Sequence, residues 1–133
     1  MTAVFADTFY FVALANARDA AHTRAVGWTR AFSGRLLTTT WVLTEFANHM
    51  CEPLNRQEFI DTLADLRSSP SVEIVPPDEL LWNEGLLLFA SRPDKKWSLT
   101  DCISFVVMQR EGIAEALTGD HHFEQAGFIA LLK

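Results

Sequence analysis

Short apolar segments alternate along this chain with longer segments in which apolar residues recur at helical spacing. The short segments carry apolar residues on both faces, as strands do when helices cover a sheet from two sides. Strands separated by helices predict a parallel sheet within an α/β sandwich of three layers. We expect the strands at residues 4–6, 36–39, 72–75, 114–118 and 128–132.

Capping and breaking residues set the bounds expected for the helices. One helix begins near Thr8, and the next runs from about Asp19, a good N-cap, to Gly34, a good C-cap. A helix from about residue 40 ends near Cys51, because a proline follows two residues later. Asn55 is expected to cap a further helix that ends before residues 68–71. The remaining helices are expected at 78–91, 98–111 and 121–126, with the apolar run 86–90 in the core.

Length and composition bound the class of protein. The 133 residues predict one domain, 1–133, and 49% hydrophobic with 21% charged residues is typical of a globular domain. A formal net charge of −6 disfavours coating of nucleic acid by bulk positive charge, although acids gathered around metal ions also make the total negative. The two cysteines, Cys51 and Cys102, form no disulfide framework and are expected to be small core residues.

The start of the chain and its apolar runs predict where the protein acts. The N-terminus, MTAVFADTFY, has no basic segment before an apolar stretch. No apolar run approaches the ~20 residues that cross a bilayer. We therefore expect a reduced, cytoplasmic protein that makes no membrane contact.

Four acids follow the expected strands or lie in the first turns of the expected helices. Asp7 and Asp120 come after apolar strands, whereas Glu45 and Asp101 lie near the starts of helices. The carboxyl ends of parallel strands share one edge of a sheet, which is where ligands bind in such folds. We therefore expect all four carboxylates to face the same edge.

Taken singly, these acids also have ordinary structural explanations. Asp120 after a glycine is typical of a loop or an N-cap, and Asp101 three residues after Ser98 fits a capping box. Asp7 is equally well explained as the start of a helix. Glu45 resists such an explanation best. It shares a helical face with Val42, Phe46 and His49, and a glutamate among apolar neighbours is seldom fully buried unless it is paired or bound to a metal.

The joint placement of the acids points to metal chemistry. Four ionised carboxylates in one place need a counter-charge, because their mutual repulsion would raise their pKa values. Mg²⁺ and Mn²⁺ are hard cations that accept oxygen ligands. Such an ion lowers the pKa of a bound water molecule and offsets charge on a phosphoryl group, so the chemistry indicated is hydrolysis of a phosphodiester.

Two longer motifs place these acids in a familiar context. The block 97–105 is WSLTDCISF, and LTGDHHF at 117–123 is followed by AGF at 126–128. Together with Asp7-Thr8 and Glu45, these motifs resemble the PIN-domain ribonucleases found as VapC-type toxins in bacterial toxin–antitoxin pairs. The resemblance runs over nearly the whole chain.

The resemblance implies a fold, an activity and a set of partners. It implies a five-stranded parallel sheet in the order 3-2-1-4-5 and an endoribonuclease that uses Mg²⁺ or Mn²⁺. It also implies an RNA substrate, a homodimer and a cognate antitoxin whose tail lies in an apolar groove between helices. The stretches 9–14 and 82–89 carry apolar residues suited to that groove, to the core or to a dimer contact.

The resemblance assigns roles to individual residues. The metal-binding, catalytic acids are Asp7, Glu45, Asp101 and Asp120. Thr8 and Thr100 would be hydroxyl supports. His122 stands where many family members have a further acid, and it would be a supporting residue or a weaker metal ligand.

Other residues near these motifs have more than one interpretation. His121 and His122 are expected to be surface or supporting histidines, because the remaining histidines and cysteines lack the spacing of a zinc site. Trp97 beside Lys95 and Lys96 is either a packed tryptophan or a ring that stacks on an unpaired RNA base while the amines contact phosphates.

Two rival functions fit part of the sequence. Receiver domains and haloacid-dehalogenase-like phosphatases also place an aspartate after the first strand. However, Phe9 stands where the phosphatase needs a second aspartate, and Lys133 lies too late for a receiver. The second rival is a non-catalytic or housekeeping PIN-like protein that acts by binding a partner, and the presence of all four acids argues against it.

Overall fold

A single parallel sheet forms the centre of the molecule. The computed structural model describes residues 2–133. Its strands are β1 (Ala3–Ala6), β2 (Arg35–Thr39), β3 (Val72–Val75), β4 (Glu115–Leu117) and β5 (Ile129–Ala130). Their order in space is β3-β2-β1-β4-β5, and every neighbouring pair is parallel. The expected fold class and strand order are confirmed, although the last strand is shorter than the expected 128–132.

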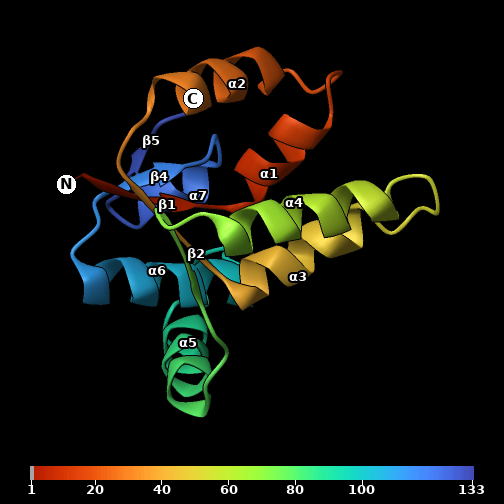
Figure 1. Ribbon diagram of the computed structural model, residues 1–133. Helices are drawn as coiled ribbons and strands as arrows, with labels where there is room; N and C mark the ends of the chain where they lie inside the picture. Colours follow the sequence, from red (N-terminus) through yellow and green to blue (C-terminus); the bar gives the residue numbers. More distant parts are fainter. Residues whose placement is uncertain (1) are drawn as a thin grey trace.

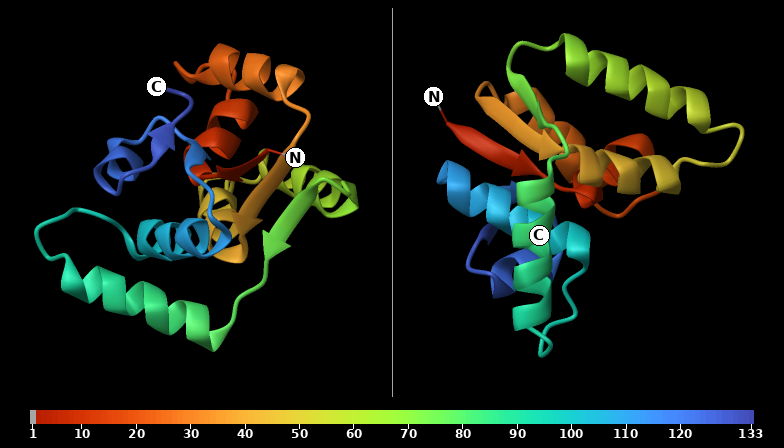
Figure 2. Two further views of the ribbon diagram at one scale, coloured as in Figure 1. Left: turned by 90° about the vertical axis from the view of Figure 1, so that its left-hand side faces the viewer. Right: turned by 90° about the horizontal axis from the view of Figure 1, so that it is seen from below.

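Helices cover both faces of this sheet. Those found within residues 2–133 are α1 (Thr8–Ala15), α2 (His22–Ala31), α3 (Thr40–His49), α4 (Arg56–Ser68), α5 (Glu79–Ser91), α6 (Leu99–Glu111) and α7 (His121–Gln125). In Figure 1, α1 and α2 lie above the sheet and α6 lies below it, which gives the three layers. Figure 2 shows α5 on the outer side of α6, away from the sheet. No helix in the described part of the chain is long and apolar enough to cross a membrane.

Aromatic pairs hold together the helices that begin at the carboxyl edge of the sheet. The rings of Phe11 on α1 and Phe46 on α3 stack with centroids 5.4 Å apart. Phe105 on α6 meets Phe123 on α7 edge to face at 4.9 Å. All four side chains are almost completely buried, so these contacts fix α1 relative to α3 and α6 relative to α7.

The second helix is shorter than the expected 19–34. It spans His22–Ala31, and Asp19 forms a turn before it by accepting a hydrogen bond from the backbone N–H of Ala21 at 2.8 Å. Gly34 is not the C-cap. A Cβ atom at Gly34 would lie 2.2 Å from the carbonyl oxygen of Thr2, so glycine is required there for the close approach of two backbone segments.

Helix α5 departs most from expectation. The run 86–90 is not core: 71% of Leu87 and 49% of Phe89 are exposed. The reason is that α5 packs on α6 through one narrow face, which includes the buried Leu81 and Gly85. A Cβ atom at Gly85 would lie 2.4 Å from Ile103 Cγ1, so the glycine allows close contact between the two helices.

The two cysteines differ in environment. Cys102 is buried in α6 as expected, and burial raises the pKa of its thiol to about 11, which keeps it unreactive. Cys51 is exposed. The expectation of a core residue is wrong for Cys51 because α3 ends at His49, which leaves the cysteine in the turn that follows the helix.

Candidate active site

Asp7 lies at the junction between β1 and α1. It occupies the N-cap position of α1, but its side chain makes no capping hydrogen bond. Instead, Thr118 Oγ1 donates to Asp7 Oδ2 at 2.9 Å. Asp7 is 5% exposed, and burial, followed by the charge of Asp101, raises the pKa of its carboxyl group to about 7. The aspartate is therefore not explained as a helix start.

Asp101 serves the start of α6 and the acid cluster at once. Its backbone N–H donates to Ser98 Oγ at 3.0 Å, and the Ser98 N–H donates to Asp101 Oδ2 at 3.1 Å, which completes the expected capping box. Asp101 is 7% exposed. Burial, with a further contribution from the charge of Asp120, raises the pKa of its carboxyl group.

Asp120 caps α7 by accepting a hydrogen bond from the backbone N–H of His122 at 2.9 Å. Its own backbone N–H donates to Thr118 Oγ1 at 3.0 Å. The hydroxyl of Thr118 therefore links Asp7 to Asp120, and it is fully buried. Sequence reasoning missed Thr118. The available signal was a threonine that ends an apolar strand directly before Gly-Asp.

Glu45 completes the cluster from α3. This helix begins immediately after β2, where Thr39 Oγ1 accepts a hydrogen bond from the backbone N–H of Val42 at 3.1 Å. Glu45 is half-buried. A cavity of about 240 Å³ is lined by Glu45 together with Asp7, Asp101 and Asp120. The structure therefore brings all four expected acids together at the carboxyl edge of the sheet.

Four further residues, which the sequence motifs did not indicate, line the same cavity. They are Phe9, Val12, Asp19 and His49. Asp19 was expected only as a helix cap, and no local pattern shows that the loop after α1 returns to the site. His49 follows Glu45 by four residues and so shares its helical face, and that spacing was the available signal for His49.

The two expected hydroxyl supports have different outcomes. Thr8 lines the acid cavity, and its Oγ1 is buried with no hydrogen-bond partner in residues 2–133. A buried polar atom left unpaired costs about 1–3 kcal/mol, so this hydroxyl is available to a ligand. Thr100 is half-buried, and no hydrogen bond within the described range joins its side chain to the acids. Ser98 and Thr118 support the acids instead.

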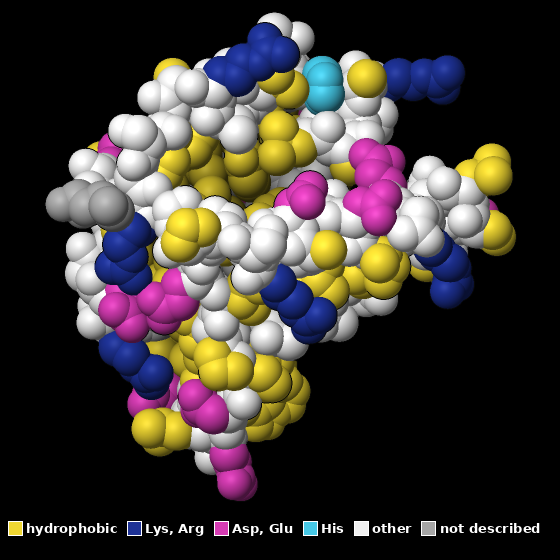
Figure 3. Space-filling model, viewed as in Figure 1, with side chains coloured by type: hydrophobic (Ala, Val, Ile, Leu, Met, Phe, Trp, Pro, Cys, Tyr) yellow, Lys and Arg dark blue, Asp and Glu magenta, His cyan; other side chains and the backbone are white. Residues whose placement is uncertain are grey.

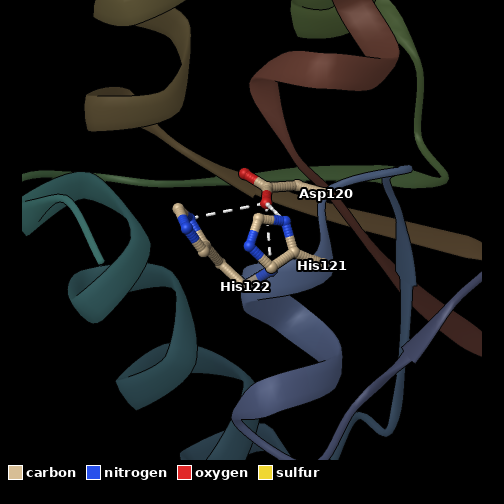
Figure 4. A group of neighbouring side chains, drawn as sticks. All are labelled: Asp120, His121 and His122. Atoms are coloured by element: carbon tan, nitrogen blue, oxygen red, sulfur yellow. Dashed lines mark hydrogen bonds and ion pairs between the residues drawn. The ribbon is translucent and has the colours of Figure 1, made fainter. Parts of the chain in front are cut away.

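Two histidines lie beside Asp120 (Figure 4). His122 Nδ1 lies 3.2 Å from Asp101 Oδ2 and 3.4 Å from Asp120 Oδ1, and its side chain is 19% exposed. His121 Nδ1 lies 3.5 Å from Asp120 Oδ1, but 67% of that side chain is exposed. His122 is therefore part of the cluster, whereas His121 lies at its edge.

Trp97 is a packed tryptophan rather than a platform for an RNA base. Only 6% of it is exposed, and its Nε1 donates to Gln125 Oε1 at 3.0 Å. The ring packs edge to face against Phe105, and the Arg92 guanidinium lies 5.2 Å from the ring centroid. The base-stacking interpretation of Trp97 is wrong, because the ring has no free face. Lys95 is half-buried and Lys96 is exposed.

The donor set of the cavity fits a divalent cation. The lining contains five carboxylates, those of the four expected acids and of Asp19, together with the unpaired hydroxyl of Thr8 and the imidazole of His49, but no lysine or arginine. Without a positive charge in the lining, burial and mutual repulsion hold the pKa of Asp7 near 7. Oxygen donors of this kind are the preferred ligands of Mg²⁺ and Mn²⁺, and a bound cation would offset the repulsion.

Comparison with known proteins identifies the fold family. The family model of the PIN domain matches residues 4–129. The chain belongs to the PIN-domain family. This PIN domain is 31% identical over 132 residues to the 23S rRNA-specific endonuclease VapC20 of Mycobacterium tuberculosis, and the alignment covers 95% of each protein. The expected resemblance is confirmed.

Solved structures give the same result. The crystal structure of Mycobacterium tuberculosis VapC20, a sarcin-ricin loop cleaving toxin, superposes on this PIN domain with a TM-score of 0.86 and 26% identity. The superposition covers 95% of this chain and 96% of that one. FitAcB from Neisseria gonorrhoeae superposes with a TM-score of 0.65 and 16% identity over 96% of this chain, a likeness of fold alone.

Proposed function

We propose that this PIN domain is a metal-dependent endoribonuclease that acts as the toxin of a toxin–antitoxin pair. One observation carries the proposal: four carboxylates from different elements line one cavity, in a chain that aligns along 95% of its length with an rRNA endonuclease. Asp7, Glu45, Asp101 and Asp120 would hold Mg²⁺ or Mn²⁺. A divalent cation there supplies an activated water molecule and offsets charge on the phosphoryl group.

The residues around the acids prepare the site for this chemistry. Thr118 donates to Asp7 and accepts from the backbone of Asp120, so it holds two acids of the site in a fixed relation. Ser98 holds Asp101 in the same way. Such preorganisation means that little rearrangement is needed when the RNA phosphate enters. The unpaired hydroxyl of Thr8 offers an additional donor in the cavity.

The relatives and the shape of the site support a choice of the first substrate to test. VapC20 is named as specific for 23S rRNA, so ribosomal RNA is the first substrate to test, and the protein would act in the cytoplasm with the ribosomes. A second hollow of about 330 Å³, lined by Asn16, Asn55 and Glu58, shares His49 with the acid cavity. It offers space and hydrogen-bonding groups for a nucleotide next to the cut. Lys95 and Lys96 remain candidates for contact with RNA phosphates.

Cleavage assays test the proposal directly. Purified protein should cut ribosomal RNA when Mg²⁺ or Mn²⁺ is present and should stop when EDTA is added. Glu45→Gln should abolish cleavage, whereas Glu52→Gln should not, because Glu52 is exposed and outside the cavity. Cleavage that persists in EDTA would contradict the metal mechanism. No cleavage of any RNA under these conditions would favour a PIN-like protein that acts only by binding a partner.

An apolar groove supports the antitoxin proposal. Hydrophobic side chains gather in a hollow between α2 and α4 in Figure 3. This cavity of about 340 Å³ is lined by Tyr10, Phe11 and Leu14 of α1, by Trp28 of α2 and by Leu66 of α4, among others. An amphipathic segment of a small partner protein fits such a groove. A basic side chain of the same partner would be attracted to the acid cavity.

Co-expression tests this partner. The chain expressed alone should arrest growth, and a small protein encoded next to it should restore growth and copurify. Asp101→Asn should lose the toxicity yet still copurify, because the apolar groove supplies most of the contact. Harmless expression of the wild-type chain at high yield would contradict the toxin proposal.

The exposed face of α5 supports the proposed homodimer. The helix presents Leu80, Trp82, Leu87 and Phe89, which are 63%, 40%, 71% and 49% exposed. Leu80 and Leu87 lie one above the other on one side of the helix, and Trp82 and Phe89 do so on the other side. Large exposed apolar side chains gathered on one element are candidates for a protein contact. Sedimentation velocity of the purified chain tests whether a second copy covers this face.

A further inference from the structure

His122 occupies a place in the acid cluster that the proposed hydrolysis does not use. Its Nδ1 atom lies between two carboxylates from different elements, 3.2 Å from Asp101 Oδ2 and 3.4 Å from Asp120 Oδ1. The backbone N–H of the same residue donates to Asp120 Oδ1 at 2.9 Å, which fixes the start of α7 relative to that acid. The ring is therefore directed at the acids by the fold.

The neighbouring histidine provides a contrast within one turn of chain. His121 also lies near Asp120, at 3.5 Å, but two thirds of its side chain is exposed. His122 is 19% exposed and contacts both acids. Figure 4 shows the two rings next to each other, both near Asp120 Oδ1, and their centroids lie 4.5 Å apart. Only His122 joins the aspartate of α6 to the aspartate before α7.

The groups that contact the acids therefore differ between the two sides of the cluster. Near Asp7 lie the hydroxyl of Thr118 and the buried, unpaired hydroxyl of Thr8. His49 also lines the cavity, but it is exposed on α3 and makes no hydrogen bond or ion pair with an acid within residues 2–133. On the side of Asp101 and Asp120, an imidazole nitrogen is added to the carboxylates. A cation on that side would meet a mixed set of nitrogen and oxygen donors.

Mixed donor sets discriminate between metals. Mg²⁺ prefers oxygen ligands and gives up its water reluctantly, whereas first-row transition ions also accept imidazole. We infer that Asp101, Asp120 and His122 form a cation subsite that prefers transition ions such as Mn²⁺ over Mg²⁺, with His122 as the residue that sets the preference. This inference rests on the proposed function, since it concerns the cation of the same site.

The opposite role for His122 makes a different prediction. If the imidazole only neutralised the two acids in place of a cation, it would compete with the metal. Removal of the ring would then raise the affinity for every divalent ion. If the ring is a ligand, its removal lowers the affinity for Mn²⁺ more than that for Mg²⁺. The sign of the change in Mn²⁺ affinity separates the two roles.

Direct binding measurements test the inference without an activity assay. We would measure Mn²⁺ affinity from the free-ion EPR signal, and Mg²⁺ affinity by competition, for wild type, His122→Ala, His122→Asp and His121→Ala. His122→Ala should lower the preference for Mn²⁺ over Mg²⁺ by about tenfold, the lower end of the effect seen when a partner is lost at a metal site. His122→Asp should lower the preference by strengthening Mg²⁺ binding. His121→Ala should change it little.

A spectroscopic signature guards against an indirect effect on folding. Pulsed EPR of Mn²⁺ bound to the wild-type protein should show coupling to an imidazole nitrogen, and His122→Asp should remove it while the variant keeps its far-UV spectrum. An unchanged preference in both His122 variants, tighter Mn²⁺ binding by His122→Ala, or nitrogen coupling lost in His121→Ala instead would each overturn the inference. If one of these results is found but the wild-type protein still binds Mn²⁺ and cuts RNA, the inference about His122 is wrong and the proposed function is still supported.

Discussion

The acid cavity and the outer face of α5 both depart from the usual distribution of polar and apolar residues. In the cavity, Asp7 and Asp101 are ionisable groups that are only 5% and 7% exposed. On α5, Leu87 and Phe89 are apolar groups that are 71% and 49% exposed. Natural proteins concentrate such departures at functional positions, because each one costs stability.

The two regions differ in how the chain compensates for the cost. The buried acids have partners within the fold, namely Thr118 for Asp7 and Ser98 for Asp101. Nothing within residues 2–133 covers the exposed apolar side chains of α5, since α5 packs on α6 by its other face. In our proposals, a small ion completes the first region, whereas a protein surface covers the second. Four substitutions or conditions test this contrast.

The largest effect is expected from Asp7→Asn. The substitution keeps the shape of the side chain and removes a metal ligand, so RNA cleavage should fall by about two orders of magnitude or more. The melting temperature at pH 8 should hold or rise, because a buried charge and its repulsion with Asp101 are removed. Asp61→Asn, on the exposed side of α4, is the matched control and should change neither quantity. Loss of activity together with a lower melting temperature would mean that Asp7 mainly supports the fold.

The second effect is a dependence of stability on pH in metal-free protein. Burial and then the charge of Asp101 raise the pKa of Asp7 from 3.8 to about 7, so between these values the folded chain holds a proton that the unfolded chain has lost. The free energy of unfolding should therefore be highest near pH 4 and should fall as the pH rises through 7, by about 4 kcal/mol at most. Urea unfolding in EDTA at pH 5 and pH 8 measures this change.

Asp7→Asn isolates the contribution of this one group. The difference in stability between wild type and variant should itself change with pH, in favour of the variant at pH 8. Saturating Mn²⁺ should restore the stability of the wild type at pH 8 and should help the variant less. Parallel pH profiles for the two proteins would mean that Asp7 does not hold the extra proton.

The acid cluster could be predicted from the sequence because its position follows from topology. Asp7 and Asp120 come after strands, and the carboxyl ends of parallel strands meet at one edge whatever the details of packing. Glu45 follows from helical phase, because it lies in the second turn of α3, the helix that begins directly after β2. The sequence did not allow a prediction that Asp19 lines the cavity. Asp19 reaches the cavity from a loop, and the path of a loop leaves no periodic pattern in the sequence.

For helix α5, by contrast, the sequence did not allow a correct prediction of which apolar residues are buried. Its run of leucines before Phe89 has the composition of a core segment, and composition alone does not show which neighbours are available to cover it. Only the contact with α6 reveals that a single narrow face is used. Trp97 was undecided for a similar reason, because nothing local indicates that Phe105 and Gln125 lie against its ring.

The third effect concerns the buried face of α5. Alanine normally stabilises a helix by about 1 kcal/mol relative to glycine. At Gly85, however, the new Cβ atom would lie 2.4 Å from Ile103, which is fully buried and has little room to move. Gly85→Ala should therefore destabilise the protein by about 1–3 kcal/mol. Gly27→Ala on α2, where nothing lies within 4 Å of the new atom, should instead stabilise it. Stabilisation by both substitutions would mean that the contact between α5 and α6 is loose.

The smallest effect on stability is expected on the exposed face of the same helix. Leu87 is 71% exposed, so Leu87→Glu should change the free energy of unfolding of the monomer by no more than about 0.5 kcal/mol. If a second copy covers α5, the new charge should nevertheless weaken self-association, because it would be buried without a partner. Leu54→Glu is the matched control, since Leu54 is 96% exposed in the turn before α4. Sedimentation velocity should show dissociation for Leu87→Glu alone, and equal behaviour of the two variants would remove α5 as the contact surface.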